Sequence, residues 1–475
     1  MSNNLKFYID GAWVDPAVPH KIAVINPATE EVFTEISGGS AADVNKAVAA
    51  AKAAFPAFAR TTKAERMDLL KTLLAIYERR MGEIAAACTA EMGAPAGFAM
   101  DAQAFVGQAH FKALIQVYED FSFTEKRGST LVVKEPIGVC GLITPWNWPL
   151  NQIVCKVAPA LAGGNTMVLK PSEIAPINAI IFAEIMHEAG VPKGVFNLVN
   201  GDGPSVGQKL AEHPDVDMMS FTGSTRAGVI VAKAAADTVK RVCQELGGKS
   251  ANILLPDVDL EAAVRNGIGA CFINSGQSCD AATRMLVPRH LHDAALAIAA
   301  DEAGKNITGD PHAPETVLGP LVSQVQFDKV QRLIKAGIDE GATLAAGGLG
   351  RPEGITKGYY ARPTVFGNVT RDMTIAREEI FGPVLSILAY DSVEEAVEMA
   401  NDTVYGLAAY VQGKDIAQVR DVAAQMRAGS VFVNYPEMDF TSSFGGYKQS
   451  GNGREYADFA LNDFLEIKSI IGYGG

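Results

Sequence analysis

The sequence predicts an α/β protein, and two observations support this prediction. From about residue 137 onward, short apolar runs alternate with helical stretches, as in IGVCGLIT at residues 137–144. Apolar strands of this kind are typical of mostly parallel sheets that helices cover on both faces. The chain also has 475 residues, which at roughly 150 residues per domain predicts about three domains. We therefore expect more than one α/β layer, with ligands at the carboxyl ends of the strands.

The segment before this region, residues 40–120, is predicted to be helical. Ser40 and Asp43 form a variant of the capping box, and small apolar residues then recur along one face of the first helix. The next helix has an apolar stripe among Glu, Lys and Arg, which is typical of an amphipathic helix. Gly93 and Pro95 end this second helix.

The later elements follow from the same alternation. Helices are predicted over about 175–189, 258–274 and 323–340, after residue 203 and from residue 225. The region after residue 260 resembles another α/β layer. Strands are predicted at 137–144, 166–170, 195–199, 218–222, 242–246, 251–255, 385–390 and 430–434.

The acidic composition excludes two classes of partner. Lys and Arg number 41 and Asp and Glu number 54, so the formal net charge is −13. An acidic surface repels the phosphates of nucleic acids and anionic lipids. No apolar stretch approaches the roughly 20 residues that cross a bilayer. The first residues, MSNNLKFYID, lack the basic and apolar regions of a signal peptide. We expect a soluble, cytoplasmic protein that binds neither nucleic acid nor membrane.

The cysteine and histidine patterns exclude two further kinds of protein. The chain has 6 cysteines without a C-x-x-C pair and 7 histidines without an H-E-x-x-H motif. Disulfide frameworks and metal sites have closer clusters of these residues. We therefore expect reduced thiols and no bound metal.

The stretch FINSGQSC, residues 272–279, places a thiol after a small polar turn. A cysteine in such a turn can lie at a cleft, where backbone N–H groups stabilise a thiolate or an oxyanion. Most cysteines are instead buried as small apolar side chains, which is the better interpretation of Cys271. The polar surroundings of Cys279 make it the stronger candidate for a nucleophile.

Glu245, in QELGGKS, ends an apolar strand and precedes two glycines. Partial burial raises the pKa of a carboxyl toward the range of a useful general base. By itself, however, this residue is better explained as a solvated glutamate at a strand end. The letters GGKS also resemble part of a phosphate-binding loop. That motif requires glycine where this chain has Cys243, so we reject a nucleoside triphosphatase.

Asn147, in TPWNWP, lies in a rigid turn between prolines and tryptophans. An amide held in this way can donate a hydrogen bond to a developing oxyanion. A buried aromatic turn with a satisfied asparagine explains the pattern equally well.

Two further segments are candidates for dinucleotide binding. VLKPSE places Lys170 and Glu173 after a strand, where they can reach ribose hydroxyls or a phosphate. In FTGSTRAG, Gly223, Ser224 and Gly228 open a helix, which suits a diphosphate. The spacing is not G-x-G-x-x-G, and glycine-rich helix starts also occur for packing alone.

The order of the motifs carries more information than any single motif. The chain contains, in the order of the NAD(P)-dependent aldehyde dehydrogenase superfamily, TPWNWP, LKPSE, FTGSTRAG, QELGGKS, FINSGQSC, EEIFGPV and FGGYKQSGNGRE. The chain resembles this superfamily almost from end to end, beginning at YIDGAWVDP. The resemblance implies an enzyme that oxidises an aldehyde to the carboxylic acid with NAD(P)+.

The resemblance also implies catalytic roles. Cys279 matches the family nucleophile, whose thiolate attacks the aldehyde carbonyl. Asn147 matches the amide that stabilises the resulting oxyanion, together with the backbone N–H of Cys279. Hydride transfer leaves a thioester, and Glu245 matches the base that activates water to hydrolyse it. Lys156 and Glu455 match a proton-relay pair behind this base.

The cofactor contacts implied by the resemblance extend over several motifs. Glu173 lies beside the adenosine ribose and would repel a 2′-phosphate, which favours NAD and leaves NADP as the alternative. The residues that match cofactor contacts are Ile143, Thr144, Pro145, Trp146, Lys170, Glu173, Gly203, Gly207, Phe221, Gly223, Ser224, Leu246, Glu379 and Phe381.

The superfamily fold implies three parts for this chain. A Rossmann-variant cofactor domain, which binds NAD(P), is expected over residues 1–118 and 138–246. A second α/β catalytic domain is expected over residues 247–456. A small β oligomerisation extension, residues 119–137 and 457–475, would join subunits into a homodimer or a homotetramer.

Two other functions compete with the hydrolytic dehydrogenase. A CoA-acylating semialdehyde dehydrogenase would transfer the acyl group from Cys279 to CoA, but such enzymes generally lack the glutamate that Glu245 matches. A non-catalytic binding descendant of the fold would tend to lose the nucleophile, and Cys279 and Asn147 are both present.

The substrate pocket is predicted to have a polar entrance, which suggests an oxygenated, short or medium aldehyde such as a semialdehyde. Asp280 would disfavour an anionic tail close to the thiol, or would instead point into a structural hydrogen-bond network, and the sequence favours neither. The predicted pocket residues are Trp148, Asn151, Gln152, Cys155, Ser278, Asp280 and Phe444.

Overall fold

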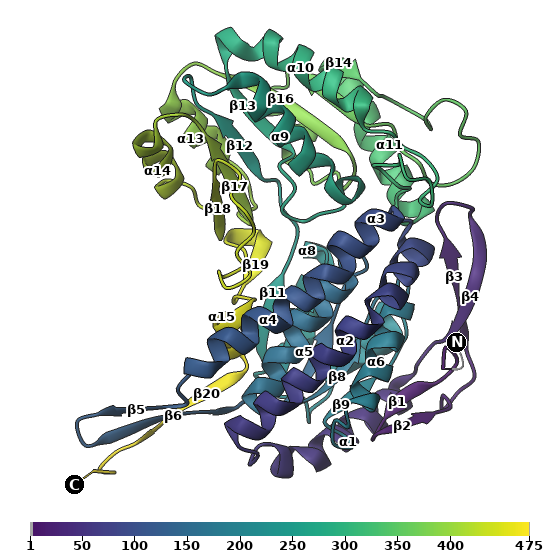
Figure 1. The fold of residues 1–475 in the computed structure, drawn as a ribbon, viewed down its shortest axis with the longest axis vertical. Coiled ribbons are helices and arrows are strands. Elements are labelled where there is room, and N and C mark those ends of the chain that lie inside the picture. The colour runs from purple at the N-terminus through teal and green to yellow at the C-terminus, as the bar shows by residue number, and fades with distance from the viewer. Residues whose placement is uncertain (1–2, 475) are drawn as a thin grey trace.

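The computed structural model describes residues 3–474 and contains two large sheets, which occupy the lower and upper halves of Figure 1. Most of their strands run parallel and are joined by helices, so the predicted α/β fold is confirmed. Two small antiparallel sheets complete the described chain.

The first large sheet consists of β1 (Phe7–Ile9), β2 (Ala12–Val14), β7 (Val139–Ile143), β8 (Thr166–Lys170), β9 (Phe196–Leu198), β10 (Met218–Thr222), β11 (Arg241–Glu245) and β19 (Gly451–Asn452). Their spatial order is β19-β11-β10-β7-β8-β9-β1-β2. The strands from β11 to β9 are parallel, whereas β19, β1 and β2 are added antiparallel at the edges. The edge strands escaped the sequence analysis because two or three residues are too few to show a period.

The helices of the first half are α1 (Ala41–Phe58), α2 (Lys63–Met92), α3 (Ala96–Phe98), α4 (Phe105–Asp120), α5 (Pro149–Gly163), α6 (Ile177–Glu188), α7 (Gln208–Glu212) and α8 (Thr225–Ala236). The predicted capping box of Ser40 and Asp43 is present at the start of α1. Helix α2 ends at Gly93, whose φ of 73° is a left-handed conformation that favours glycine. Helices α2, α4, α5 and α6 pack together in front of the sheet in Figure 1.

The second large sheet consists of β12 (Ala251–Leu254), β13 (Arg284–Pro288), β14 (Thr343–Ala346), β15 (Thr364–Gly367), β16 (Val384–Tyr390), β17 (Ala408–Gln412) and β18 (Ser430–Val433). Their order is β14-β15-β16-β13-β12-β17-β18, and β14 alone of the seven is antiparallel to its neighbour. Its helices are α9 (Leu260–Phe272), α10 (His292–Lys305), α11 (Gln324–Asp339), α12 (Thr374–Arg377), α13 (Val393–Asn401) and α14 (Ile416–Ala424).

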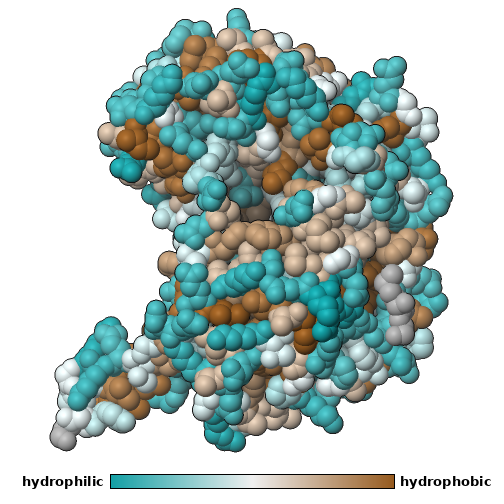
Figure 2. Space-filling view, viewed as in Figure 1, coloured by the Kyte–Doolittle hydropathy of each residue, from teal (hydrophilic) through white to brown (hydrophobic). Residues whose placement is uncertain are grey.

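An arm leaves the molecule at the lower left of Figures 1 and 2. It is the three-stranded sheet of β5 (Thr124–Arg127), β6 (Thr130–Pro136) and β20 (Leu465–Ile470), and it follows α15 (Ala457–Asp463). A hairpin of β3 (Lys21–Asn26) and β4 (Glu31–Ser37) forms the fourth sheet. On the arm, Ile467 is 71% exposed and Ile471 is 83% exposed.

Strand β19 connects the end of the chain to the first sheet. Its residues Asn452 and Gly451 pair with Gln244 and Glu245 of β11. Gly451 has a φ of 126°, and a Cβ there would overlap the carbonyl oxygen of Gln244, so only glycine fits. Residues close to the C-terminus therefore support the strand that ends in Glu245.

Within residues 3–474, none of the helices combines the length and the apolarity that a membrane crossing requires.

Candidate active site

Two loops meet at the candidate nucleophile. One follows β7 and carries Asn147, and the other precedes Cys279. The side-chain amide of Asn147 donates a hydrogen bond of 3.0 Å to the carbonyl of Gln277. The indole of Trp148 donates one of 2.6 Å to Ser278 Oγ. Asn147 is therefore held beside the turn of Cys279, as an oxyanion donor must be.

The turn before Cys279 has a strained backbone. Asn274 and Ser275 have φ values of 54° and 56°, which non-glycine residues rarely adopt. Asn274 Nδ2 donates to the carbonyl of Asn147 at 2.8 Å, and Ser275 Oγ donates to the carbonyl of Gly319 at 2.9 Å. These contacts hold a conformation that costs about 1–3 kcal/mol per residue and that is typical of functional sites.

Cys279 lies where two cavities meet, because it lines both. The strand-end cavity lies at the carboxyl ends of β7, β10 and β11, where α/β sheets bind ligands. Seven of the predicted cofactor residues line it, namely Pro145, Trp146, Gly223, Ser224, Leu246, Glu379 and Phe381.

The other predicted cofactor residues lie near the carboxyl-terminal edge of the same sheet but outside this cavity. Lys170 ends β8, and its ammonium forms an ion pair of 2.9 Å with Glu173. Thr144 Oγ1 is buried without a hydrogen-bond partner. The others are Ile143 at the end of β7, Phe221 in β10, and Gly203 and Gly207 at the two ends of the turn before α7.

The sequence analysis missed three polar residues of the strand-end cavity, Thr222 at the end of β10 and, in the second half of the chain, Gln326 and Lys329. The last two lie on a helix, α11, and their spacing of three residues places them on one helix face. Burial lowers the pKa of Lys329, against the attraction of Glu379. Gln326 Oε1 is buried and has no hydrogen-bond partner. No motif announces Gln326 and Lys329, because the fold alone brings α11 to this edge.

The candidate base, Glu245, is only 3% exposed, and neither of its carboxylate oxygens has a hydrogen-bond partner. Burial raises the pKa of this carboxyl well above its usual range, and the neighbouring Glu455 raises it further while Lys156 opposes them. The solvated glutamate that the strand-end position suggested does not occur. A buried, unpartnered carboxyl with a raised pKa is suited to take a proton from water.

Lys156 and Glu455 form a buried ion pair behind Glu245. Lys156 Nζ also donates to Thr222 Oγ1 at 2.7 Å. Burial opposes the positive charge of Lys156, but the combined attraction of Glu455, Cys155 and Glu245 outweighs it, and the pKa of the lysine is raised. This pair is the one expected to relay protons behind Glu245.

The surroundings of Cys279 favour the neutral form of its thiol. Burial raises its pKa well above the ordinary range, and the carboxylates of Asp280, Glu379 and Glu245 raise it further. The thiolate is the nucleophile, so attack on a carbonyl requires that a proton leave the sulfur.

The second cavity, the aromatic cavity, has a volume of about 300 Å³, enough for a small ligand. Of the predicted pocket residues, Trp148, Asn151, Gln152, Ser278, Asp280 and Phe444 line it, together with Phe105, Phe440 and Tyr456. The cavity combines the predicted polar side chains with five aromatic ones, Phe105, Trp148, Phe440, Phe444 and Tyr456. Phe105 and Phe440 were not predicted, because they come from α4 and from the segment before residue 444, outside the motifs.

Cys155 was predicted to line the pocket, but it is not among the residues that line the aromatic cavity. Its thiol donates a hydrogen bond of 3.3 Å to Glu455 Oε2, and it packs with Phe444 and Tyr456. Cys155 therefore lies behind the cavity wall, beside the ion pair.

His110 supports Asn151 from behind the wall of the aromatic cavity, and the sequence analysis did not identify it. His110 Nε2 contacts Asn151 Oδ1, and the imidazole ring lies 4.3 Å from the ring of Tyr456. Burial lowers the pKa of His110 to about 4. The histidine is therefore neutral near pH 7 and fixes the orientation of the Asn151 amide.

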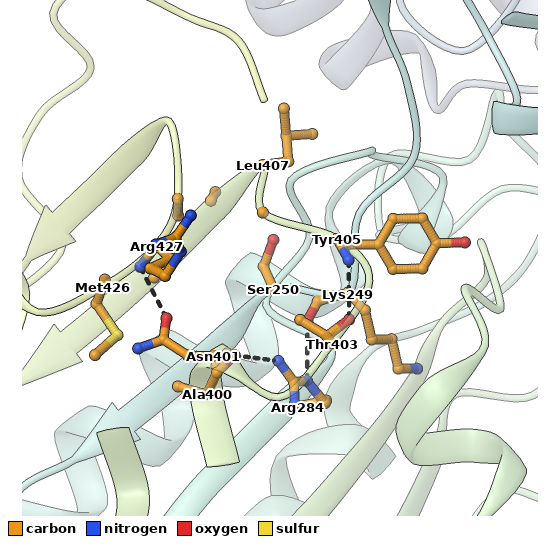
Figure 3. Close-up of a pocket in the computed structure, with 15 residues that line it drawn as sticks. Lys249, Ser250, Arg284, Ala400, Asn401, Thr403, Tyr405, Leu407, Met426 and Arg427 are labelled. Atoms are coloured by element: carbon orange, nitrogen blue, oxygen red, sulfur yellow. Dashed lines mark hydrogen bonds between the residues drawn. The ribbon is translucent and has the colours of Figure 1, made fainter. Parts of the chain in front are cut away.

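The Gly-Gly-Lys-Ser turn after Glu245 is structural, in agreement with the rejection of a phosphate loop. A Cβ on Gly248 would overlap the carbonyl oxygen of Cys279, so this turn packs directly on the nucleophile segment. Arg284 donates to the carbonyls of Lys249 and Ala400 (Figure 3) and to the carbonyl of Met399, and so fixes the turn. The adjoining cavity of about 10 Å³ has room for roughly one water molecule.

Residues 3–474 contain no cluster of three or more His, Cys, Asp or Glu side chains that is arranged to hold a metal ion.

The comparisons with known proteins agree with one another. The model of the aldehyde dehydrogenase family matches residues 13–470. A 3-succinoylsemialdehyde-pyridine dehydrogenase of a Pseudomonas species is 53% identical over 476 residues and is covered, like this chain, over 100% of its length. A crystal structure of a mutant aldehyde dehydrogenase C of Pseudomonas syringae with NAD+ and octanal is 53% identical, with a TM-score of 0.98 and coverage of 99% of this chain and 97% of that one. An aldehyde dehydrogenase of Bartonella henselae is 51% identical, with a TM-score of 0.97 and coverage of 99% and 100%.

The chain belongs to the aldehyde dehydrogenase family. It is an oxidoreductase that oxidises aldehydes, and the resemblance seen in the sequence is confirmed.

Proposed function

We propose that Cys279 is the nucleophile of an NAD-dependent dehydrogenase that releases a free carboxylic acid. The observation that supports this most directly is that Cys279 lines both cavities, so one sulfur faces an aldehyde on one side and a cofactor on the other. The crystal structures of three relatives with NAD+ support NAD as the cofactor.

The residues of the strand-end edge fit a dinucleotide. The Glu173 carboxylate, whose side chain is 34% exposed, can accept hydrogen bonds from the adenosine ribose and would repel a 2′-phosphate. Glu379 and Lys329 face the same cavity as Cys279, and the buried Gln326 Oε1 lacks a partner that a ligand amide or hydroxyl would supply. NADP is the alternative cofactor, which a comparison of the two KM values decides.

In the first step, the Cys279 sulfur bonds to the aldehyde carbon and its proton leaves. The Asn147 amide and the backbone N–H of Cys279 donate to the oxyanion that forms. NAD+, when bound, supplies the acceptor for the hydride that leaves this carbon. The acyl group then remains on Cys279 as a thioester.

In the second step, Glu245 takes a proton from water, whose oxygen attacks the thioester carbon and releases the carboxylic acid and the Cys279 thiolate. The thiolate takes back from solvent the one proton that the sulfur gave to solvent in the first step. The balance is one aldehyde, one NAD+ and one water converted into one carboxylic acid, one NADH and one proton. Lys156 and Glu455 lead that proton away from Glu245. A buried position without a hydrogen-bond partner in the protein favours this base, because a water that enters with the substrate can then bind the carboxylate.

The competing function is acyl transfer to CoA. The buried carboxyl of Glu245 favours hydrolysis, since acyl transfer to a thiol needs no activated water. We expect free acid without added CoA. If the enzyme forms acyl-CoA when CoA is present and no acid when CoA is absent, it is a CoA-acylating dehydrogenase and not a hydrolytic one.

The role of Glu245 is tested by Glu245→Gln, which keeps the size of the side chain and removes the base. Deacylation should slow about a hundredfold, so a burst of NADH is expected before a slow steady state. The matched control is Glu379→Gln, which should raise the KM for NAD without producing a burst. A steady-state rate of Glu245→Gln equal to that of the wild type would show that another group activates the water.

We further propose that the arm joins subunits into a homodimer or homotetramer in the cytoplasm. The exposed Ile467 and Ile471 support this, because apolar side chains of an arm are normally covered by a partner. The same proposal assigns residues 1–118 and 138–246 to cofactor binding, residues 247–456 to the catalytic domain and residues 119–137 and 457–475 to assembly. Sedimentation of Ile467→Asp against the wild type tests the assembly, with a smaller species expected for the variant.

A further inference from the structure

We propose that Asp280 is a specificity-determining residue that makes the aromatic cavity select aldehydes whose tails carry no negative charge. This inference rests on the proposed function of Cys279 and of the aromatic cavity as the site of the aldehyde. It names the substrate class of that site as neutral or cationic aldehydes with an apolar or aromatic tail.

The first observation is the charge of the cavity wall. Among the residues that line the aromatic cavity, two are acidic, Asp101 and Asp280, and none is Lys, Arg or His. A carboxylate that leaves water for a protein cavity needs a cation or several hydrogen-bond donors, and arginine supplies both best. The aromatic cavity offers neutral donors such as Asn151 and Gln152 but no cation to balance the charge of a carboxylate-bearing tail.

The second observation is that the Asp280 carboxylate takes no part in hydrogen bonds or ion pairs with other side chains of residues 3–474. Within residues 3–474 no other side chain donates to it, its own backbone N–H is the one group that stabilises its charge, and burial raises the pKa of this carboxyl. Its backbone carbonyl instead accepts a hydrogen bond of 3.1 Å from the hydroxyl of Tyr410, whose ring stacks on Phe432 at 4.8 Å. The backbone of Asp280 is therefore fixed, the residue lines the cavity, and its carboxylate accepts no hydrogen bond from another side chain, which argues against a structural hydrogen-bond network.

The third observation is the position of this charge next to the reacting sulfur. Asp280 follows Cys279 in the chain, and its carboxylate is one of the groups that raise the pKa of the thiol. A tail that occupies the aromatic cavity must pass this carboxylate. In a cavity with aromatic walls the repulsion between two negative charges is weakly screened, so an anionic tail is penalised in both binding and reaction. Aromatic faces attract a cationic tail and tolerate a neutral one.

The test compares matched aldehydes of one chain length that end in a carboxylate or in its methyl ester. We expect the wild type to prefer the ester by about tenfold or more in kcat/KM, mainly through KM. In Asp280→Asn the preference should fall to about twofold or less, because the KM for the carboxylate drops. Asp280→Glu keeps the charge and should keep the preference.

The matched control is Asp101→Asn, which makes the same charge change at an exposed position of the same cavity. Screening by water should leave its preference within about twofold of the wild type. Three results would each overturn the role of Asp280. The wild type could show no preference for the ester, Asp280→Asn could keep the wild-type preference, or Asp101→Asn could lose the preference to the same extent as Asp280→Asn.

A second measurement does not depend on turnover. The Cys279 thiol is alkylated with iodoacetamide or iodoacetate, which are neutral and anionic reagents of similar size, and the modified peptide is quantified by mass spectrometry. The thiolate fraction cancels in the ratio of the two rates. Asp280→Asn should raise the relative rate of iodoacetate about tenfold, and an unchanged ratio would contradict the proposal. If the wild type oxidises neither aldehyde, the proposed function fails while the alkylation ratio still decides the role of Asp280.

Discussion

The two cavities that meet at Cys279 differ in how the chain builds them. The strand-end cavity is formed mainly by residues that directly follow strands, such as Trp146 after β7 and Leu246 after β11. The aromatic cavity gathers single side chains from α4, α5 and the segment around Phe440. A site at strand ends is tied to the sheet, whereas a site made of helix and loop side chains can change its walls one residue at a time. We therefore expect the cofactor to be a fixed property of this fold and the aldehyde to be an adjustable one.

The largest effect is expected for Cys279→Ala, because this residue belongs to both cavities. Aldehyde oxidation should fall at least about a thousandfold, measured as NADH formation. NAD affinity measured by calorimetry should stay within about twofold, since the alanine removes no cofactor contact apart from the sulfur. Comparable loss of NAD binding would mean that the cavities are not independent.

A smaller loss of activity is expected for Asn147→Ala. Asn147 lines only the strand-end cavity, but its amide is proposed to donate to the oxyanion of the aldehyde. Loss of an oxyanion donor costs about 2.7–4 kcal/mol, or roughly a hundredfold to a thousandfold in kcat. The KM for NAD should change little. If Asn147→Ala lowers the melting temperature but leaves kcat unchanged, Asn147 only holds the turn before Cys279 in place through its hydrogen bond to Gln277.

Two single variants separate the cavities directly. Lys329→Ala should raise the KM for NAD about tenfold and leave the KM for the aldehyde unchanged, and Phe440→Ala should do the reverse. The double variant should show the two effects multiplied, because the residues lie in different cavities. Strong non-additivity in kcat/KM would reveal coupling across Cys279.

The smallest effect is expected at Lys249, which lines neither cavity. Burial lowers its pKa to about 7, below the usual value of about 10.4 in the unfolded chain. The unfolded chain then binds more protons, so this residue makes the folded state more stable as pH rises from about 7 toward 10, by at most about 1.4 kcal/mol per pH unit. Lys249→Met should flatten that part of the stability curve in denaturant titrations while kcat stays near the wild-type value. An unchanged slope would show that Lys249 is charged in the folded protein.

The same contrast explains what the sequence could predict. Buried strands such as TMVLK can be recognised in the sequence as apolar runs. The residues that directly follow such a strand can then be assigned to the ligand-binding edge of the sheet. The ion pair of Lys156 and Glu455 followed only from the resemblance, because the two residues lie 299 positions apart. Phe440, Gln326 and Lys329 were missed for the same physical reason, since tertiary packing and not local pattern brings them to the site.

The burial of Glu245 was also beyond local sequence reasoning. Its strand end looks solvent-accessible in isolation, and a Cβ at Gly445 would lie 2.7 Å from Glu245 Oε1. The glycines of FGGYK therefore let a distant segment close over the carboxylate. The pKa shift of the base is a property of the assembled fold.

The pairing of β19 with β11 has a consequence for biosynthesis. Ser450 Oγ donates to the carbonyl of Gly247 at 2.7 Å across 203 residues of chain. Since a ribosome delivers the N-terminal portion first, the pocket around Glu245 stays open to water until residues 445–452 have been synthesised. A chain that ends before these residues would thus contain Glu245 and the loop of Cys279 but would lack the segment that buries Glu245. Aldehydes in the cell would meet a competent enzyme only after the last strand of that sheet has docked.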